Sequence, residues 1–528
     1  MKTFRHLVLF ASLLFAAYGA YAQGSTNSAI TGKVTTSDGE PLVGVNVLAV
    51  HTPTGSRYGA VTDLEGFYRI SNMRSGGPYS ITVSYVGYRE FKLEGETLPL
   101  GVTTRINAEL QEEASALDEV VITATTDRTF DSNKTGAETY ISQRDINRLP
   151  QTSRSIADFV RTTPQVQLRE GDDGFSISIA GQNNRYNAIY IDGAVNNDVF
   201  GLAGSGTNGG QTGVSPFSVD AIESFQVQLA PYDVKIGGFS GGAISAVTRS
   251  GTNQWQGSSY YFYRNEDLAG KTPSGLVNEG DRRERLAEFT AETYGIRIGG
   301  PIIENKLFFF ANYEREEIET PQPFNFSNYQ GDASRVDIDN LIGFVRNNFG
   351  YEMGGFENNT RTLESDKFTL KLDWNLNDRH KISLSGRYVE ADNLEARNSS
   401  NSFLGFANGS EAFVSETTSL SAEWGYQGDT YSNNMVVGYT RVRDDRDPAG
   451  NPFPTVVIRD GGGNMEFGAE RFSTANLLDQ DIFTFTNNFE IYKGAHTITF
   501  GTHNEYSDIK NLFLASNFGT YTFSSIND

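Results

Sequence analysis

SDKFTLKLDWNL, residues 365–376, alternates residue by residue between polar and apolar side chains. One face of an extended strand would carry Phe368, Leu370, Leu372 and Trp374. The opposite face would carry Thr369, Lys371, Asp373 and Asn375. A period of two indicates a β-strand with one apolar face. Strands of soluble sandwiches run about 5–6 residues, whereas strands that cross a membrane in a barrel run about 10, so the length favours a membrane barrel.

The same pattern recurs along the rest of the chain. Further alternating segments are Tyr260–Tyr263, Thr290–Gly299, Lys306–Glu314, Ile382–Tyr388, Ser419–Tyr426, Asn434–Val442, Phe483–Ile491 and Thr497–Tyr506. Short connections, such as 299–305 and 492–495, alternate with long ones, 316–363 and 443–479. In outer-membrane barrels the short turns are periplasmic and the long loops extracellular. We therefore expect residues 251–528 to form part of a transmembrane β-barrel.

Composition and charge narrow the class of protein. The 528 residues carry 43 Lys plus Arg and 65 Asp plus Glu, a formal net charge of −22, which argues against nucleic acid as a partner. The 25 Tyr and 36 Phe favour β-structure. The chain has no Cys, which excludes disulfides, thiolate metal sites, cysteine nucleophiles and a lipid anchor on cysteine.

The N-terminus has the features of a secretory leader. Lys2 and Arg5 precede an apolar run from Leu7 to Ala17, and Ala20-Tyr21-Ala22 offers small residues where a signal peptidase reads. The alternative, a transmembrane helix, needs about 20 apolar residues. We therefore expect residues 1–22 to be a cleaved signal peptide. Since no later apolar run reaches 18 residues, a closed barrel is the remaining way to span a bilayer.

Residues 23–111 carry short alternating strands separated by Gly- and Pro-containing turns, a pattern typical of an immunoglobulin-like sandwich. One strand shows the alternation through Val43, Val45, Val47 and Ala49. The segment resembles the carboxypeptidase regulatory-like domain. The pieces that carry this resemblance are Gly32-Lys33-Val34, Pro41–Val45, Thr62–Phe67 and Val86-Gly87-Tyr88.

Residues 117–124 are an apolar, β-prone segment with no expected strand partner nearby. Such a segment is either the edge strand of a domain or a strand that another protein pairs with. Its position before a polar stretch resembles the TonB box of outer-membrane receptors. The resemblance implies that TonB pairs in the periplasm with Asp118, Glu119, Val120, Val121, Ile122 and Thr123.

Residues 125–250 predict a mixed α/β unit. Ser142 is a helix cap, Ser153–Thr162 a short helix, and Asn187–Gly193 a strand that ends in a turn. This order of elements resembles the plug domain of TonB-dependent receptors. The usual plug has Arg-Gly before the strand that ends in Asp-Gly, and Ala180-Gly181 stands there instead, so no role is transferred to that arginine.

Motifs of enzymes and metal sites lack their structural context. Gly238–Gly242 fits a nucleophile elbow, but an alternating strand pattern follows where a helix is needed. Gly204–Gly209 fits a dinucleotide fingerprint but opens no helix. His496 and His503 lie seven apart on an expected strand and so face opposite ways. The acidic run 444–447 is either a calcium ligand or a solvated loop. We expect no enzyme, no cofactor and no metal.

Taken together, the chain is similar to TonB-dependent outer-membrane receptors of the Oar-like kind, relatives of the SusC-like importers. The strongest pieces are Ser240–Asn253, Tyr260–Asn265 and Tyr294–Phe310. The resemblance implies a mainly β protein of the outer membrane, with its N-terminal domain and TonB box in the periplasm. It also implies energised uptake of a metal chelate, glycan or peptide. The implied partners are TonB with its inner-membrane energising complex, outer-membrane lipid and a SusD-like lipoprotein.

Two questions stay open at this point. A surface adhesion or matrix-type protein without active transport is the alternative function, and passive or export traffic is a third. The sequence predicts roughly ten strands, whereas barrels of this kind have about 22. The end, Phe523–Asp528, also lacks a terminal aromatic residue. We therefore expect this chain to be the N-terminal part of a longer product.

Overall fold

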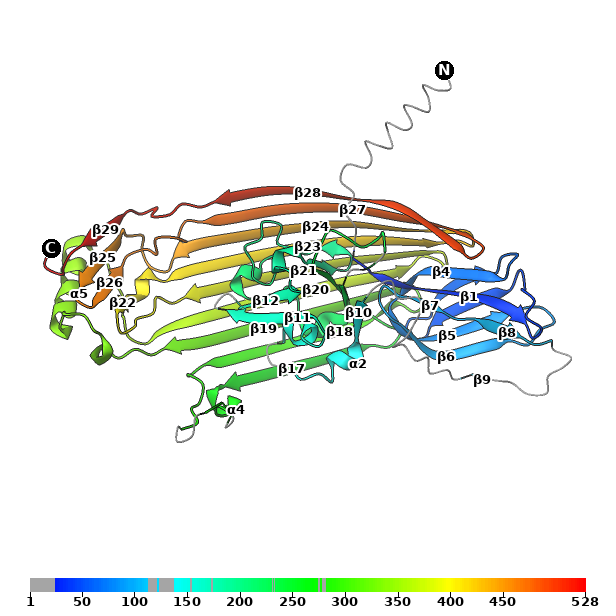
Figure 1. The fold of residues 1–528 in the computed structure, drawn as a ribbon, viewed down its shortest axis with the longest axis horizontal. Helices are drawn as coiled ribbons and strands as arrows, with labels where there is room; N and C mark the ends of the chain where they lie inside the picture. The colour runs from blue at the N-terminus through cyan, green and yellow to red at the C-terminus, as the bar shows by residue number, and fades with distance from the viewer. Residues whose placement is uncertain are drawn as a thin grey trace, which may run out of the picture.

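Three β-rich units follow one another in the computed structural model (Figure 1). The structure describes residues 24–112, 121–122, 137–151, 154–171, 174–229, 231, 233–273, 276–277 and 282–528. The predicted signal peptide lies outside these residues, as do Asp118, Glu119, Val120 and Thr123 of the predicted TonB box. Among the described residues, every helix is too short or too polar to cross a membrane.

The N-terminal unit is the predicted immunoglobulin-like sandwich of two sheets. One sheet holds β4 (Phe67–Arg74), β1 (Asn27–Thr36), β7 (Thr103–Arg105) and β8 (Ala108–Leu110). The other runs β3 (Ser56–Val61), β2 (Asn46–His51), β5 (Gly76–Ser84), β6 (Phe91–Leu98) and β9 (Val121–Ile122). Val47, Ile70 and Ile81 are fully buried between them, so apolar burial stabilises this unit.

The plug is a five-stranded sheet with short helices. The order is β10 (Ala137–Ser142), β15 (Ile222–Leu229), β16 (Gly242–Thr248), β13 (Ala188–Ile191) and β14 (Ala194–Val195). A hairpin of β11 (Val166–Gly171) and β12 (Gly174–Ile179) accompanies α2 (Gln143–Ile146), α3 (Ile156–Val160), η3 (Asn184–Tyr186), η4 (Gly210–Thr212) and η5 (Val219–Ala221). Ser142 caps α2 with a capping box, as predicted. The chain after Gly241 is strand β16, so the nucleophile-elbow geometry does not form.

The third unit is a curved antiparallel sheet of nine strands within the described residues (Figure 1). In order these are β17 (Gln256–Asn265), β18 (Thr290–Ile303), β19 (Leu307–Gln322), β20 (Asn359–Asn375), β21 (His380–Glu395), β23 (Glu411–Gln427), β24 (Tyr431–Pro448), β27 (Leu477–Lys493) and β28 (His496–Leu512). Helix α4 (Glu266–Ala269) follows β17. Several strands extend well into the predicted long loops, because residues 315–322 and 359–364 continue the ladder.

The two faces of this sheet have inverted polarity. On β20, Lys367, Lys371 and Asp373 are buried on the inner face, whereas Phe368 and Trp374 are 45% and 40% exposed on the outer face. An outward apolar face suits contact with lipid. Near the far end of the strands the outer face turns polar, since Arg315 pairs there with Glu317 at 2.6 Å and Asp366 at 2.7 Å.

The long connections fold into a separate cap at the end of the barrel opposite the N-terminal unit (Figure 1). It contains η7 (Phe326–Asn328), α5 (Arg335–Phe349), η8 (Ala407–Gly409) and the sheet β22 (Phe403–Gly405), β26 (Gly463–Phe467), β25 (Thr455–Asp460) and β29 (Thr520–Phe523). Ile338, Met353, Phe406 and Met465 are all fully buried in its core. The sequence predicted loops here, and the structure shows a packed subdomain.

Candidate functional site

The plug lies on the polar inner face of the barrel sheet, and a buried ion pair joins them. The Lys371 ammonium on β20 lies 3.3 Å from the Asp192 carboxylate and donates to the Thr248 carbonyl at 3.0 Å. Asp192, in the turn after β13, also accepts from the Thr248 amide and hydroxyl at 3.0 and 2.8 Å. Burial opposes ionisation of Asp192, but Lys371 and these hydrogen bonds outweigh it and hold its pKa below the usual range.

A second buried cluster centres on Glu314 of β19. Its carboxylate accepts from Ser218 of the plug and from Tyr260 of β17, both at 2.9 Å, and lies 3.2 Å from the Lys367 ammonium. The plug residue Arg154 pairs with Asp220 and lies 3.5 Å from Glu314. Sequence reasoning missed this cluster, although the strand period places Glu314 on the inner face with Phe308 and Phe310.

Hydrogen bonds to neutral acceptors complete the contact between plug and wall. Arg387 of β21 donates to the Asn196 side chain at 3.3 Å and to the Pro216 carbonyl at 3.4 Å. The Ser421 hydroxyl donates to the Asp192 carbonyl at 2.9 Å. Polar groups of this kind can exchange a protein partner for water. A small apolar cluster, Val214 of the plug with Val389 and Ala391 of β21, adds to these polar contacts.

The N-terminal sandwich docks on the short turns at the opposite end of the barrel from the cap. The Asn72 side-chain amide donates to the Tyr426 and Asn433 carbonyls at 3.0 and 2.9 Å, so it caps the turn between β23 and β24. Asn72 has a φ of 55°, a left-handed conformation that Asn tolerates better than most residues. Arg74 lies 3.3 Å from Asp373 on the same side of the sheet.

One barrel carboxylate touches both other units. Glu490 of β27 lies 3.2 Å from the Lys235 ammonium of the plug. Its other oxygen lies 3.3 Å from the Arg69 guanidinium and accepts from the Ser71 hydroxyl at 2.8 Å, both in the sandwich. The positions of the plug and the N-terminal domain are therefore linked through a single side chain.

Part of the predicted TonB box has a strand partner in the structure. Val121 and Ile122 form β9, which pairs in parallel with Lys92 and Leu93 of β6. The sequence predicts no strand partner nearby, and this prediction is wrong for these two residues. The physical reason is that β6 otherwise ends the sheet and offers unpaired backbone groups to a β-prone segment.

The two histidines considered as metal ligands differ in burial. His503 is buried and hydrogen-bonds Thr486 at 2.5 Å, whereas His496 is exposed at the start of β28. Asp444, in the acidic run considered for calcium, accepts instead from Ser415 at 2.6 Å and Gln211 at 2.8 Å. Among the described residues, no three His, Asp or Glu side chains cluster as a metal site would need.

Comparison with known families agrees with this geometry. Residues 29–111 match the carboxypeptidase regulatory-like domain, residues 131–244 the TonB-dependent receptor plug domain, and residues 247–337 and 339–527 the outer membrane beta barrel domain. The chain therefore belongs to the outer-membrane β-barrel family. Its plug and its relatives make it a TonB-dependent receptor, located in the outer membrane with the plug and N-terminal domain on the periplasmic side.

Two curated relatives and one solved structure illustrate the similarity. The TonB-dependent transporter Oar of Myxococcus xanthus is 29% identical over 327 residues, 58% of this chain and 28% of that protein. The TonB-dependent receptor SusC of Bacteroides thetaiotaomicron is 31% identical over 119 residues, 22% of this chain and 10% of that protein. The outer membrane transporter YddB from Escherichia coli shares the fold, with a TM-score of 0.50, 17% identity, and coverage of 70% of this chain and 48% of that one.

Proposed function

We propose that this receptor imports a bulky solute across the outer membrane, with TonB supplying the work. The observation that supports the proposal is the set of buried ion pairs between plug and barrel wall, above all Asp192 with Lys371 and Arg154 with Glu314. Breaking one buried pair costs about 3–5 kcal/mol, several times the thermal energy. Displacing a plug held in this way requires free energy from outside, because the outer membrane has no energy source of its own.

We propose that TonB binds the TonB box, Asp118–Thr123, which precedes a plug segment that we place at residues 125–250. TonB would pair with it by backbone hydrogen bonds, as in other strand additions. Because Val121 and Ile122 pair with β6 in the structure, TonB would replace β6 as the partner of these residues. The solute is proposed to be a metal chelate, a glycan or a peptide, and the similarity to SusC supports a SusD-like lipoprotein as an additional partner.

The test is uptake by cells that carry Val121→Pro. Proline removes the backbone donor and fixes φ, so pairing with TonB is lost. Val121→Ala keeps the donor and is the matched control. The solute is identified first, from growth on ferric chelates, glycans and peptides with and without the gene. We expect Val121→Pro to bind this solute at the cell surface but not to import it, and Val121→Ala to do both.

Normal uptake by Val121→Pro would contradict the TonB-box assignment. Uptake that is independent of both Val121 and TonB would favour passive or export traffic. Surface binding without uptake in every strain, including the unmodified one, would favour an adhesion protein. Surface labelling of each strain measures how much receptor reaches the outer membrane.

A further inference from the structure

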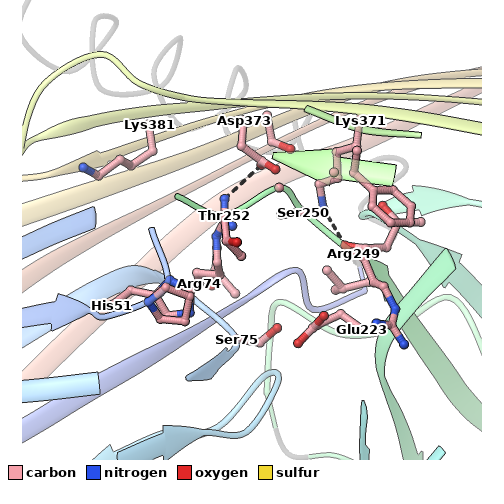
Figure 2. Close-up of a pocket in the computed structure, with 18 of the residues that line it drawn as sticks. His51, Arg74, Ser75, Glu223, Arg249, Ser250, Thr252, Lys371, Asp373 and Lys381 are labelled. Atoms are coloured by element: carbon pink, nitrogen blue, oxygen red, sulfur yellow. Dashed lines mark hydrogen bonds and ion pairs between the residues drawn. The ribbon is translucent and has the colours of Figure 1, made fainter. Parts of the chain in front are cut away.

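A cavity of about 620 Å³ lies where the N-terminal domain, the plug and the barrel wall meet (Figure 2). We call it the junction chamber. The sandwich contributes His51 and Arg74, and the plug contributes Glu223. The barrel strand β20 contributes Lys371 and Asp373. The chamber therefore lies on the periplasmic side of the plug, with the N-terminal domain as its floor.

The ionisable side chains that line the junction chamber have an excess of positive charge. The cations are Arg74, Arg249, Arg297, Lys371 and Lys381, and the carboxylates are Glu223, Asp373 and Glu423. His51 adds no charge, because burial and the nearby Arg74 lower its pKa to about 3. The whole chain, in contrast, has a net charge of −22. The charge of the chamber is therefore opposite in sign to that of the whole chain.

Two of the five cations are already neutralised. Arg74 pairs with Asp373 and Lys371 pairs with Asp192, each at 3.3 Å. Of the chamber's other carboxylates, Glu423 accepts from the neutral Thr26 and Asn434 at 2.8 and 2.6 Å. Its Oε1 is thus hydrogen-bonded by neutral donors rather than by a chamber cation.

The other three cations, Arg249, Arg297 and Lys381, donate hydrogen bonds to neutral acceptors. None of the ion pairs found among the described residues includes them. Arg249 donates to the Ile222 carbonyl at 3.2 Å, and Lys381 donates to the Asn377 carbonyl at 3.0 Å. Arg297 donates to the Ser258 hydroxyl at 2.6 Å. The carboxylates of Glu223 and Asp220 act on Arg249 from a distance, and that of Asp378 acts on Lys381, but none forms a direct ion pair with them. Buried cations are usually found in direct pairs, because burying a charge without one is unfavourable.

The two arginines converge on one short plug segment. Arg249 bonds the carbonyl of Ile222, and Arg297 bonds the carbonyl of Asp220 at 3.4 Å. Burial and then the positive charge of Arg297 lower the pKa of Arg249 to about 10, against the opposite effect of Glu223 and Asp220, so the two guanidinium groups are close enough to repel each other. A bound anion between them would remove this repulsion. Guanidinium groups match the geometry of carboxylate and phosphate oxygens.

We propose that the junction chamber binds an oxyanion, a carboxylate or phosphate group, between Arg249 and Arg297. Resting on the proposed import function, this means that the transported solute carries such a group and meets these arginines after it passes the plug. Lys381, on the barrel side of the same cavity, adds to the attraction. The N-terminal domain has a role in this arrangement, since His51 and Arg74 line one side of the chamber.

The first test measures anion binding by the protein purified from outer membranes in detergent. Calorimetric titrations use inorganic phosphate in one arm and citrate in the other, which separates phosphate from carboxylate recognition. We expect the double variant Arg249→Gln/Arg297→Gln to lose affinity at least about tenfold, since charge-assisted bonds are lost. Arg346→Gln is the matched control, because Arg346 is exposed on α5 and pairs with Glu352 in the cap.

A second measurement locates the anion without any substitution. Crystals soaked in tungstate should show an anomalous peak between the two guanidinium groups. Absence of that peak, absence of binding by the unmodified protein, or equal binding by the double variant would each overturn the proposal. These measurements contain no TonB, so their result is independent of the uptake seen with Val121→Pro.

Discussion

The N-terminal sandwich and the barrel sheet use the same alternating pattern with opposite sides facing inward. In the sandwich, Val47 and Ile81 fill the interior. In the barrel, Lys371 and Asp373 face the interior, while Leu370 is 40% exposed on the outside. Alternation therefore predicts a strand but does not say which face is the inner one. That depends on whether water or lipid surrounds the sheet.

The sandwich interior and the contact between barrel and plug are also stabilised by different interactions. The sandwich interior is held by apolar burial, which is lost when packing is lost. The barrel interior is held to the plug by paired charges and hydrogen bonds, which can be exchanged one at a time. The interior of the N-terminal domain and the contact between plug and wall thus differ in the chemistry that holds them.

The largest effect is expected at the plug, from Lys371→Met. Methionine keeps much of the volume but leaves Asp192 buried beside the wall without its cation partner. We expect the plug to lose about 3–5 kcal/mol of docking free energy. Hydrogen exchange of the β13 amides, measured on the purified protein, reports this loss. Adding Asp192→Asn to Lys371→Met should recover part of it, and an equal loss in the double variant would contradict a specific pair.

A smaller effect compares the same kind of truncation in the two sheets. Ile81→Ala leaves a cavity in the sandwich and should cost about 2–5 kcal/mol. Leu370→Ala on the outer face of β20 should cost less than about 1 kcal/mol, because lipid fills the space as well as leucine does. Thermal unfolding in detergent measures both. Similar losses in the two variants would show that Leu370 does not face lipid.

A further expected effect is a pH dependence that originates in the sandwich. His51 is buried with a pKa of about 3, against 6.5 when exposed, so the unfolded chain binds the proton and the folded chain does not. Stability is full above pH 6.5 and falls as the pH drops toward 3, by about 1.4 kcal/mol per pH unit. Unfolding of the N-terminal domain between pH 7 and pH 4 checks this. His51→Gln, which does not titrate, should flatten the slope.

Much of the fold was predictable because it depends on local pattern. The period of two found the strand Ser365–Leu376 and its neighbours, and Ser142 marked the start of α2. The contacts of the site were not predictable in this way. Ser71 and Glu490 lie 419 positions apart, and nothing in either local segment specifies that they meet. The cap was missed because its buried residues come from three separate connections, each too short to show a core of its own.

The length of the barrel strands has a consequence for the cell surface. Strand β24 has 18 residues, about 60 Å of extended chain, and at a tilt of about 40° it rises about 45 Å. The apolar band of an outer-membrane barrel is only about 25 Å tall. The outward Arg315, with its paired carboxylates, cannot lie in hydrocarbon and so marks where the band ends. The wall therefore extends about 20 Å above the apolar band, and the cap lies beyond the headgroup layer rather than at it.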